Sequence, residues 1–205
     1  MRNKNKFSRA DVQLVEKKRV YDGYFKLDSY ILNHPLYLGG RSENLTRLIF
    51  DRGRVGAVLP YDPYRDEVVM LEQFRPGPYA AGIDCWLLES VAGVLEEGET
   101  AEELVKREAI EEAGCSITLL EPMYCFLPSA GVSSEVVDLF CGKTDTTAVG
   151  GIHGLAEEGE DIRVQVMPRK QARQLLDTGK IVNGKTIIAL QWLELNYLRL
   201  HSIWI

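Results

Sequence analysis

The sequence predicts an α/β fold, a mixed sheet covered by helices, with a small antiparallel β subdomain at the N-terminus. Three observations predict it. Apolar and polar residues alternate near the N-terminus, continuous apolar runs follow, and segments with helical signals come after them. A chain of 205 residues, 45% of them hydrophobic, can bury one substantial core with a small appendage. We expect the subdomain over residues 1–45 and the main domain over residues 46–205.

The N-terminal segment carries the alternation. Apolar and polar residues alternate from Val12 to Leu32 around the turn signal Asp22-Gly23, as they do in half-buried antiparallel strands. From His34 to Gly40, proline and glycine residues interrupt regular structure. This interruption places the end of the subdomain near residue 45.

Apolar runs predict the central strands. Val55 to Leu59 and Val68 to Leu71 are joined by a stretch that contains the turn signal Asp62-Pro63. Two more apolar stretches, Met123 to Leu127 and Val136 to Cys141, predict further strands.

The C-terminal part predicts a loop and two helices. Residues 143–161 form a polar stretch with four glycines, and a loop of this length is uncommon unless it is functional or disordered. Residues 168–176 begin with proline and are followed by Gly179, as helices often are. Residues 186–200 are rich in Ile and Leu and predict a helix packed on the core.

The composition argues against several classes of protein. A net charge of −6 disfavours a nucleic-acid-binding surface, which needs clustered Lys and Arg. The four cysteines show no C-x-x-C spacing and lie in apolar stretches, which predicts buried, reduced thiols. The basic N-terminus lacks an apolar leader, and no apolar run is long enough to span a membrane. We expect a cytoplasmic protein with neither a nucleic acid nor a membrane as partner.

A helix with clear end signals follows residue 99. Thr100 can cap its N-terminus, with Glu103 completing a capping box, and Gly114 can end it. Its apolar face consists of Ala101, Leu104, Val105 and Ala109. At about 100° per residue, Glu108 and Glu112 fall within the same arc.

Two carboxylates on an apolar face need a compensating cation, because they repel each other and burial multiplies the cost. Ligands that are all oxygen favour Mg²⁺, with Mn²⁺ as a substitute. Glu111 lies at the edge of the face, and Glu103 and Arg107 can pair on the outer side. The alternative interpretation is an acidic helix that is simply solvated.

The spacing favours the metal interpretation. Gly93 is followed after five residues by Glu99, after seven more by Arg107-Glu108, after two by Glu111-Glu112 and after one by Gly114. This pattern resembles the box of the Nudix family, a loop-helix-loop unit whose glutamates hold divalent cations against a diphosphate linked to a nucleoside.

The resemblance implies roles within the box. The metal-associated positions would be Glu108, Glu111, Glu112 and the backbone carbonyl of Ala92, with Glu111 also counted as catalytic. Structural positions would be Gly93, Glu99, Arg107 and Gly114. Glu99 and Arg107 would pair and brace the loop.

Beyond the box, the chain is similar to bacterial ADP-ribose pyrophosphatases along nearly its whole length. The similarity rests on residues 21–25, 86–89, 151–158 and 188–193. It implies a Nudix-type α/β/α sandwich with an N-terminal β subdomain. It also implies a homodimer in which that subdomain reaches the partner's active site. One departure is Ala130, where these enzymes typically carry a proline.

The same resemblance implies roles outside the box. Glu158 would activate the attacking water, and Glu160 would be a further metal-associated carboxylate. The substrate would be contacted by Tyr24, Arg47, Arg75 and Glu135, with the arginines on phosphate or ribose and the tyrosine on adenine. The alternative interpretations are a solvated acidic loop, surface ion pairs of the arginines and a core position for the tyrosine.

We therefore expect hydrolysis of the diphosphate bond of ADP-ribose to AMP and ribose 5-phosphate, with Mg²⁺ as cofactor. A pyrophosphatase for another nucleoside diphosphate sugar, such as GDP-mannose, is the first alternative, and Ala130 keeps it open. A non-catalytic ADP-ribose-binding module is the second, but such a module would be expected to have lost glutamates of the box.

Overall fold

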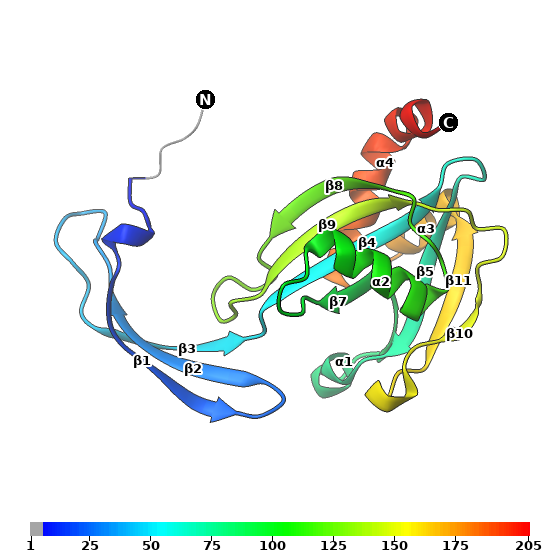
Figure 1. The fold of residues 1–205 in the computed structure, drawn as a ribbon. Helices are drawn as coiled ribbons and strands as arrows, with labels where there is room; N and C mark the ends of the chain where they lie inside the picture. Colours follow the sequence, from blue (N-terminus) through cyan, green and yellow to red (C-terminus); the bar gives the residue numbers. More distant parts are fainter. Residues whose placement is uncertain (1–5) are drawn as a thin grey trace. The chain divides into compact units, whose positions relative to one another are not determined.

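The computed structural model describes residues 6–205, except for the side chain of Glu158, and it contains two compact units. The smaller unit comprises the described residues up to Gly53 together with Ser129–Glu135. The larger unit comprises Arg54–Pro128 and Val136–Ile205. Each unit has its own sheet (Figure 1).

The smaller unit is a three-stranded antiparallel sheet in the order β1-β2-β3. It contains η1 (Arg9–Asp11), β1 (Gln13–Asp22), β2 (Lys26–Asn33) and β3 (Leu45–Asp51). The predicted pair of strands around Asp22-Gly23 is confirmed. The segment Ser129–Glu135 joins this unit because the N–H of Phe50 donates to the carbonyl of Val132 at 2.8 Å.

This sheet extends beyond the boundary expected near residue 45. β3 begins at Leu45 and pairs with β2 along its length, so the unit ends at Gly53. The interruption from His34 to Gly40 is a loop between two paired strands, closed by an isolated bridge between Pro35 and Arg41. The proline and glycine residues there mark the end of a strand and not the end of a unit.

The larger unit is built on a mixed sheet in the order β10-β11-β5-β4-β9-β8, with β6 paired to β5 and β7 paired to β4. Its strands are β4 (Arg54–Asp62), β5 (Glu67–Phe74), β6 (Trp86–Glu89), β7 (Val91–Val94), β8 (Leu119–Phe126), β9 (Val136–Lys143), β10 (Gly151–His153) and β11 (Ile162–Pro168). The pairing of β4 with β9 is parallel, and the other pairings are antiparallel. The predicted central strands are confirmed.

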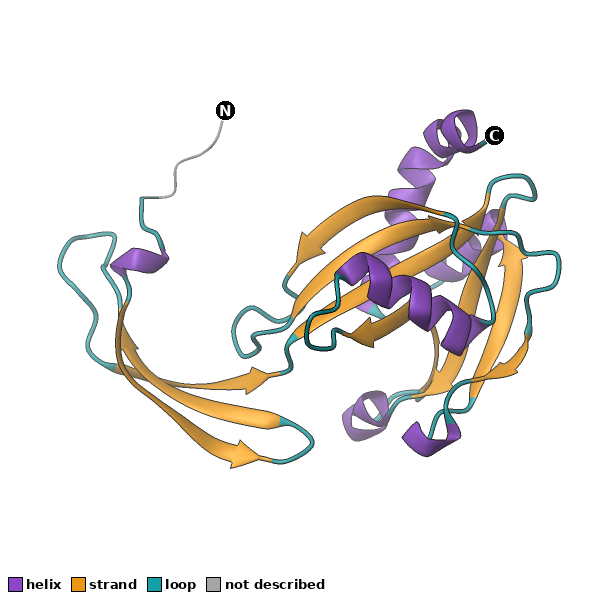
Figure 2. Cartoon of the chain, in the orientation of Figure 1, coloured by secondary structure: helices purple, strands orange, loops and turns teal. Residues whose placement is uncertain are grey.

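Helices cover both faces of this sheet (Figure 2). The helices of this unit are α1 (Pro76–Ala81), α2 (Ala101–Ala113), the short η2 (Ala156–Glu158), α3 (Arg169–Asp177) and α4 (Gly184–Trp204). The helix α2 lies on one face, and α3 and α4 lie on the other. The predicted α/β/α sandwich is therefore confirmed.

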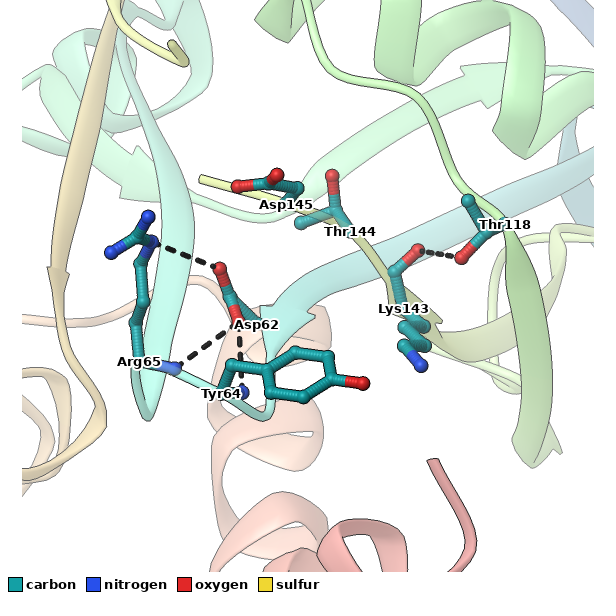
Figure 3. A pocket seen from close by; sticks show the side chains of 7 residues that line it. All are labelled: Asp62, Tyr64, Arg65, Thr118, Lys143, Thr144 and Asp145. Carbon is teal, nitrogen blue, oxygen red and sulfur yellow. Dashed lines mark hydrogen bonds and ion pairs between the residues drawn. The ribbon is translucent and has the colours of Figure 1, made fainter. Parts of the chain in front are cut away.

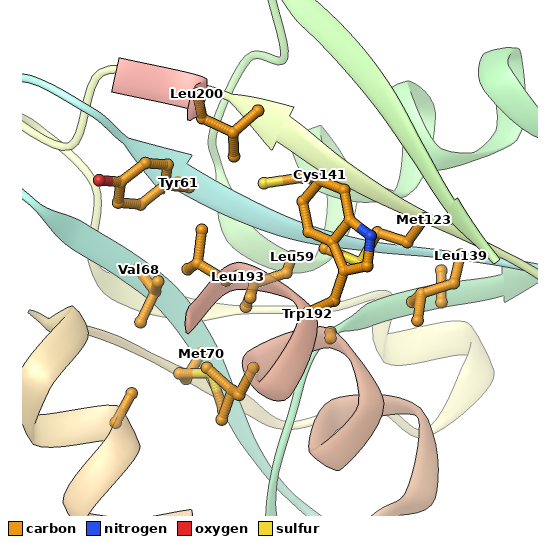
Figure 4. Close-up of a cluster of buried hydrophobic side chains, with 14 of the residues drawn as sticks. Leu59, Tyr61, Val68, Met70, Met123, Leu139, Cys141, Trp192, Leu193 and Leu200 are labelled. Atoms are coloured by element: carbon orange, nitrogen blue, oxygen red, sulfur yellow. The ribbon is translucent and has the colours of Figure 1, made fainter. Parts of the chain in front are cut away.

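The central strands are continuous apolar runs because both of their faces are buried. Leu59 of β4 and Met70 of β5 pack with α4 in one apolar cluster (Figure 4). Their neighbours Val58 and Val69 point to the opposite face and pack with α2 in a second cluster. Two packed layers thus hold α2 at a fixed position against the middle of the sheet.

Three expectations need correction or extension. The polar stretch 143–161 is not a continuous loop, because it contains β10 and η2. Of the four free cysteines, Cys115 and Cys141 are buried as expected, but Cys125 is exposed because it lies on the edge strand β8. The C-terminal helix is longer than expected, from Gly184 to Trp204.

Among the described helices, none is long and apolar enough to cross a membrane.

Candidate active site

The box helix forms as its end signals predict. The N–H of Glu103 donates to the Thr100 hydroxyl at 3.3 Å, and the Glu103 carboxylate accepts the N–H of Thr100 at 2.9 Å. Gly114 ends the helix with φ of +60°. The Glu103 carboxylate is used in this capping box. The pair of Glu103 with Arg107 that the sequence suggested on the outer side is therefore not formed.

Glu112 is a buried carboxylate on the inner face of α2. Its residue is 2% exposed, and its oxygen accepts the backbone N–H of Ala92 on β7 at 3.0 Å. Burial chiefly, with a smaller contribution from the charges of Glu108 and Glu160, raises the pKa of Glu112 to about 8. This carboxylate therefore becomes fully ionised near neutral pH only when a cation compensates it.

Glu108 lies on the same face, with its side chain 15% exposed. Burial raises the pKa of its carboxyl, although the neighbouring Arg107 acts in the opposite direction. Gly93 of β7 passes directly over it, since a Cβ at Gly93 would stand 2.0 Å from Oε1 of Glu108. Only glycine allows β7 and the carboxylate to approach so closely.

Arg107 joins the loop before α2 to the carboxylates on it. Its Nε lies 3.1 Å from Glu99, and its terminal nitrogen lies 3.0 Å from Glu108 and 2.8 Å from Glu111. The expected pairing of Arg107 with Glu99 is present, and it lowers the pKa of Glu99. One guanidinium thus fixes the geometry of three box glutamates.

The acidic loop after β10 lies against the end of α2. The N–H of Gly154 donates to the carbonyl of Glu111 at 3.3 Å, and a Cβ at Gly114 would stand 2.5 Å from the ring of His153. The Glu160 carboxylate accepts the N–H of Leu155 at 3.1 Å. The charge of Glu160 reaches both Glu108 and Glu112, so the loop adds a third carboxylate to this cluster.

These oxygens fit a hard divalent cation. Three carboxylates, from Glu108, Glu112 and Glu160, act on one another, and the most buried of them has no ion-pair partner among the described residues. Within residues 6–205 as described, no three acidic, His or Cys side chains already stand in a closed metal-binding arrangement. A cation would draw the carboxylates together and compete with Arg107 for Glu108 and Glu111.

The remaining predicted residues are distributed over both units. Tyr24 lies in the turn between β1 and β2 and is 90% exposed, so the alternative of a core position is wrong. Arg47 is exposed on β3, and Glu135 lies 3.9 Å from Arg52. These three belong to the smaller unit, and their roles stay predictions. The Glu158 side chain lies outside the described part of the structure.

A pocket of about 490 Å³ elsewhere in the larger unit shares no residue with the carboxylate cluster. It is lined by Asp62, Tyr64, Arg65, Thr118, Lys143, Thr144 and Asp145 (Figure 3). The Asp62 carboxylate accepts the backbone N–H groups of Tyr64 and Arg65, at 2.9 and 3.2 Å, and that of Thr146 at 3.0 Å. Asp62 therefore forms the predicted turn after β4 and is not free for a ligand.

Residues 51–190 match the NUDIX domain. This chain belongs to the Nudix family. It is 46% identical over 198 residues to the ADP-ribose pyrophosphatase of Escherichia coli strain K12, which covers 97% of this chain and 95% of that protein. It is 32% identical over 183 residues to the GDP-mannose pyrophosphatase of Pectobacterium atrosepticum, with 89% and 93% covered.

The Nudix fold is also found in a solved structure of low sequence identity. The crystal structure of an ADP compounds hydrolase matches with a TM-score of 0.69 at 16% identity, covering 94% of this chain and 96% of that one. This likeness supports the fold alone.

Two polar residues outside the Nudix box, Glu89 and Asn183, were not predicted from the sequence. Glu89 is buried at the end of β6 and accepts hydrogen bonds from Arg75 at 2.7 Å and from Asn183 at 2.6 Å. A carboxylate at the end of the apolar run Trp86-Leu87-Leu88 was the available signal, because a buried charge needs partners. Asn183 offered only a helix-capping signal, since it lies far away in the sequence.

Proposed function

We propose that this Nudix protein hydrolyses the diphosphate bond of ADP-ribose to AMP and ribose 5-phosphate, with Mg²⁺ as cofactor and Mn²⁺ as a substitute. The observation that carries the proposal is the buried Glu112 carboxylate, which faces Glu108 and Glu160 beside β7. The 46% identity to an ADP-ribose pyrophosphatase over 97% of the chain supports this substrate.

The metal would be held by Glu108, Glu112 and Glu160, by the backbone carbonyl of Ala92 and with help from Glu111. Bound there, it would neutralise the diphosphate and lower the pKa of a coordinated water. Gly93 lets β7 pass close to the Glu108 carboxylate, and this close approach would allow the Ala92 carbonyl and the carboxylates to hold the metal together.

The protein's own groups would orient the reaction. Glu158 would accept a proton from the attacking water, and the new P–O bond would form as the bond to the bridging oxygen breaks. The backbone of Glu158 lies in η2, five residues after His153, which packs on Gly114. The loop is thus anchored to the box helix immediately before its acidic part.

The substrate would be recognised by residues outside the box. We assign Arg75 to the phosphate oxygens, because a guanidinium can donate two parallel hydrogen bonds to them. We assign Tyr24 to the adenine ring, Arg47 to phosphate or ribose and Glu135 to a polar contact. We also propose that the protein is a cytoplasmic homodimer, with the smaller unit as the dimerisation element.

The second candidate substrate is another nucleoside diphosphate sugar, GDP-mannose in particular. The 32% identity to a GDP-mannose pyrophosphatase over 89% of the chain favours it. Ala130 in the smaller unit, where ADP-ribose pyrophosphatases typically carry a proline, keeps it open.

A substrate panel separates these possibilities. ADP-ribose, GDP-mannose and UDP-glucose are incubated with the full-length protein in Mg²⁺ or in a chelator, and products are separated by chromatography. We expect AMP chiefly from ADP-ribose and only with Mg²⁺. Preferred cleavage of GDP-mannose would overturn the substrate assignment, and no cleavage of any compound would support a binding module.

A further inference from the structure

Glu89 is a buried carboxylate with two specific partners in the larger unit. It ends β6, opposite Leu71 of β5, and its side chain is 5% exposed. One oxygen accepts Nε of Arg75 at 2.7 Å, and the other accepts the side-chain amide of Asn183 at 2.6 Å. Burying a carboxylate costs free energy unless its oxygens are hydrogen-bonded. Because both oxygens of Glu89 are bonded, losing either partner would leave a buried oxygen unpaired, and both partners are therefore held firmly.

The hydrogen bond of Arg75 to Glu89 leaves the two terminal guanidinium nitrogens available for a ligand. Among the described residues, Nε is the only nitrogen of this side chain with a hydrogen-bonding partner. The side chain is 37% exposed, and its charge lowers the pKa of Glu112. The two terminal nitrogens thus have no hydrogen-bonding partner among the described residues, and the side chain that carries them is partly exposed and acts electrostatically on the carboxylate cluster. A guanidinium held through Nε offers those two nitrogens as a pair to an oxyanion.

Asn183 connects this pair to the C-terminal helix. Its side-chain oxygen caps α4 by accepting the N–H of Thr186 at 3.2 Å, while its amide donates to Glu89. The Thr186 hydroxyl in turn accepts the N–H of Ser90 at 2.9 Å in a fully buried position. The N-terminus of α4 is thereby tied to residues 89 and 90, directly before β7, which carries Ala92 and Gly93.

We propose that Glu89, itself oriented by Asn183, is a positioning residue that fixes the guanidinium of Arg75 for a substrate phosphate. Arg75 would then donate from both terminal nitrogens to the diphosphate of a nucleotide sugar while the adjacent carboxylates hold the metal. The inference rests on the proposed function, in which Arg75 contacts phosphate. It makes the α4 cap part of substrate binding and not only of folding.

Three variants test the chain of contacts. Glu89→Gln is almost isosteric but places an amide against the Asn183 amide and removes the charge opposite Arg75. Asn183→Ser keeps a good N-cap for α4 but is too short to bond Glu89. Arg75→Ala removes the phosphate contact itself. KM and kcat for ADP-ribose are measured at saturating Mg²⁺, together with the Mg²⁺ concentration for half-maximal activity and the melting temperature.

The expected results separate positioning from folding. Glu89→Gln raises KM about tenfold and Asn183→Ser about threefold, while kcat and the Mg²⁺ requirement change little, because substrate binding is weakened uniformly. Arg75→Ala raises KM by more than either. In the Arg75→Ala background, Glu89→Gln should raise KM by less than about twofold. The effects of two residues that act as one unit are not additive.

The matched control is Glu194→Gln, which neutralises a carboxylate bonded to Arg169 at 2.6 Å on the same helix, α4. It should leave KM unchanged even if the melting temperature falls. An unchanged KM in Glu89→Gln, or an effect that multiplies fully with Arg75→Ala, would overturn the positioning role alone. Normal kinetics in Arg75→Ala would instead overturn the phosphate assignment of Arg75, and the positioning role with it.

Discussion

Glu112 shows how a single buried group connects stability to function. Burial raises its pKa from 4.5 to about 8 in the metal-free protein. A carboxyl with a raised pKa binds its proton more tightly in the folded state. The resulting contribution to the free energy of unfolding is fully present below about pH 4.5 and is lost as the pH rises towards about 8.

The raised pKa predicts that raising the pH destabilises the metal-free wild type. Between pH 5 and pH 8, its free energy of unfolding should fall by about 2–4 kcal/mol more than that of Glu112→Gln. Glutamine keeps the acceptor for the Ala92 N–H but carries no charge. Denaturant unfolding at several pH values measures the difference. Parallel pH profiles for the two proteins would contradict the burial cost.

Gly93 gives a steric prediction. In Gly93→Ala the new Cβ would stand 2.0 Å from Oε1 of Glu108, so the carboxylate has to move out of the cluster. We expect a loss of activity of about 100-fold or more, with a stability loss of about 1–3 kcal/mol. Steady-state kinetics and thermal melting measure the two effects.

The control for this change is Gly184→Ala at the start of α4, where a Cβ meets nothing within 4 Å. It should keep both activity and melting temperature. If Gly93→Ala behaves like this control, β7 does not need its close approach to the helix.

At the scale of elements, a charged network ties the turn after β4 to the helices behind the sheet. Arg169 begins α3 and bonds Asp66 at 2.7 Å and Glu194 of α4 at 2.6 Å. Burial by itself raises the pKa of Asp66, but hydrogen bonds from Arg169 and Tyr61 outweigh it and hold that pKa below 3.8. The stability from this pair is therefore present above about pH 4 and is lost as pH falls further.

Asp66→Asn tests this network. Asp66 has φ of +54°, a conformation that asparagine also tolerates, so the change removes the charge without straining the turn. We expect a stability loss of about 1–2 kcal/mol at pH 7, modest because Asp66 is partly exposed. The difference between the two proteins should shrink as the pH is lowered below about 4 and Asp66 becomes protonated. A difference that stays constant as the pH falls would show that the charge of Asp66 is not the cause.

Local signals allowed most elements to be predicted. The capping box at Thr100 and the left-handed Gly114 fixed the ends of α2, and the apolar runs fixed β4 and β5, because these signals lie within a few residues of the structure they form. The boundary near residue 45 was misplaced because the loop before β3 carries the same breaking residues as a linker between units.

The site was predictable only where the motif is continuous. The box placed Glu108 and Glu112 on one helix, but the bond from Arg75 to Glu89 and that from Asn183 to Glu89 join residues 14 and 94 positions apart. Such pairs follow from the pairing of β5 with β6 and from the packing of α4, which no local pattern contains. The same holds for the packing of His153 on Gly114.

At the scale of the whole molecule, a chain with a net charge of −6 is proposed to bind a dianionic substrate. That charge would have to be compensated locally, and in the proposed function Arg75 and a cation in the carboxylate cluster of the larger unit would do this. The smaller unit would add specificity through Tyr24, Arg47 and Glu135.

ADP-ribose hydrolysis by wild type and Glu112→Gln over a Mg²⁺ titration tests whether the carboxylate cluster holds the metal for the reaction. We expect AMP and ribose 5-phosphate from the wild type only when Mg²⁺ is present. The variant should melt at or above the wild-type temperature in metal-free solution at pH 8 but lose about 1,000-fold in kcat, because a metal ligand is missing. Wild-type turnover by the variant, or wild-type turnover in a chelator, would contradict the carboxylate-held metal as the basis of the reaction.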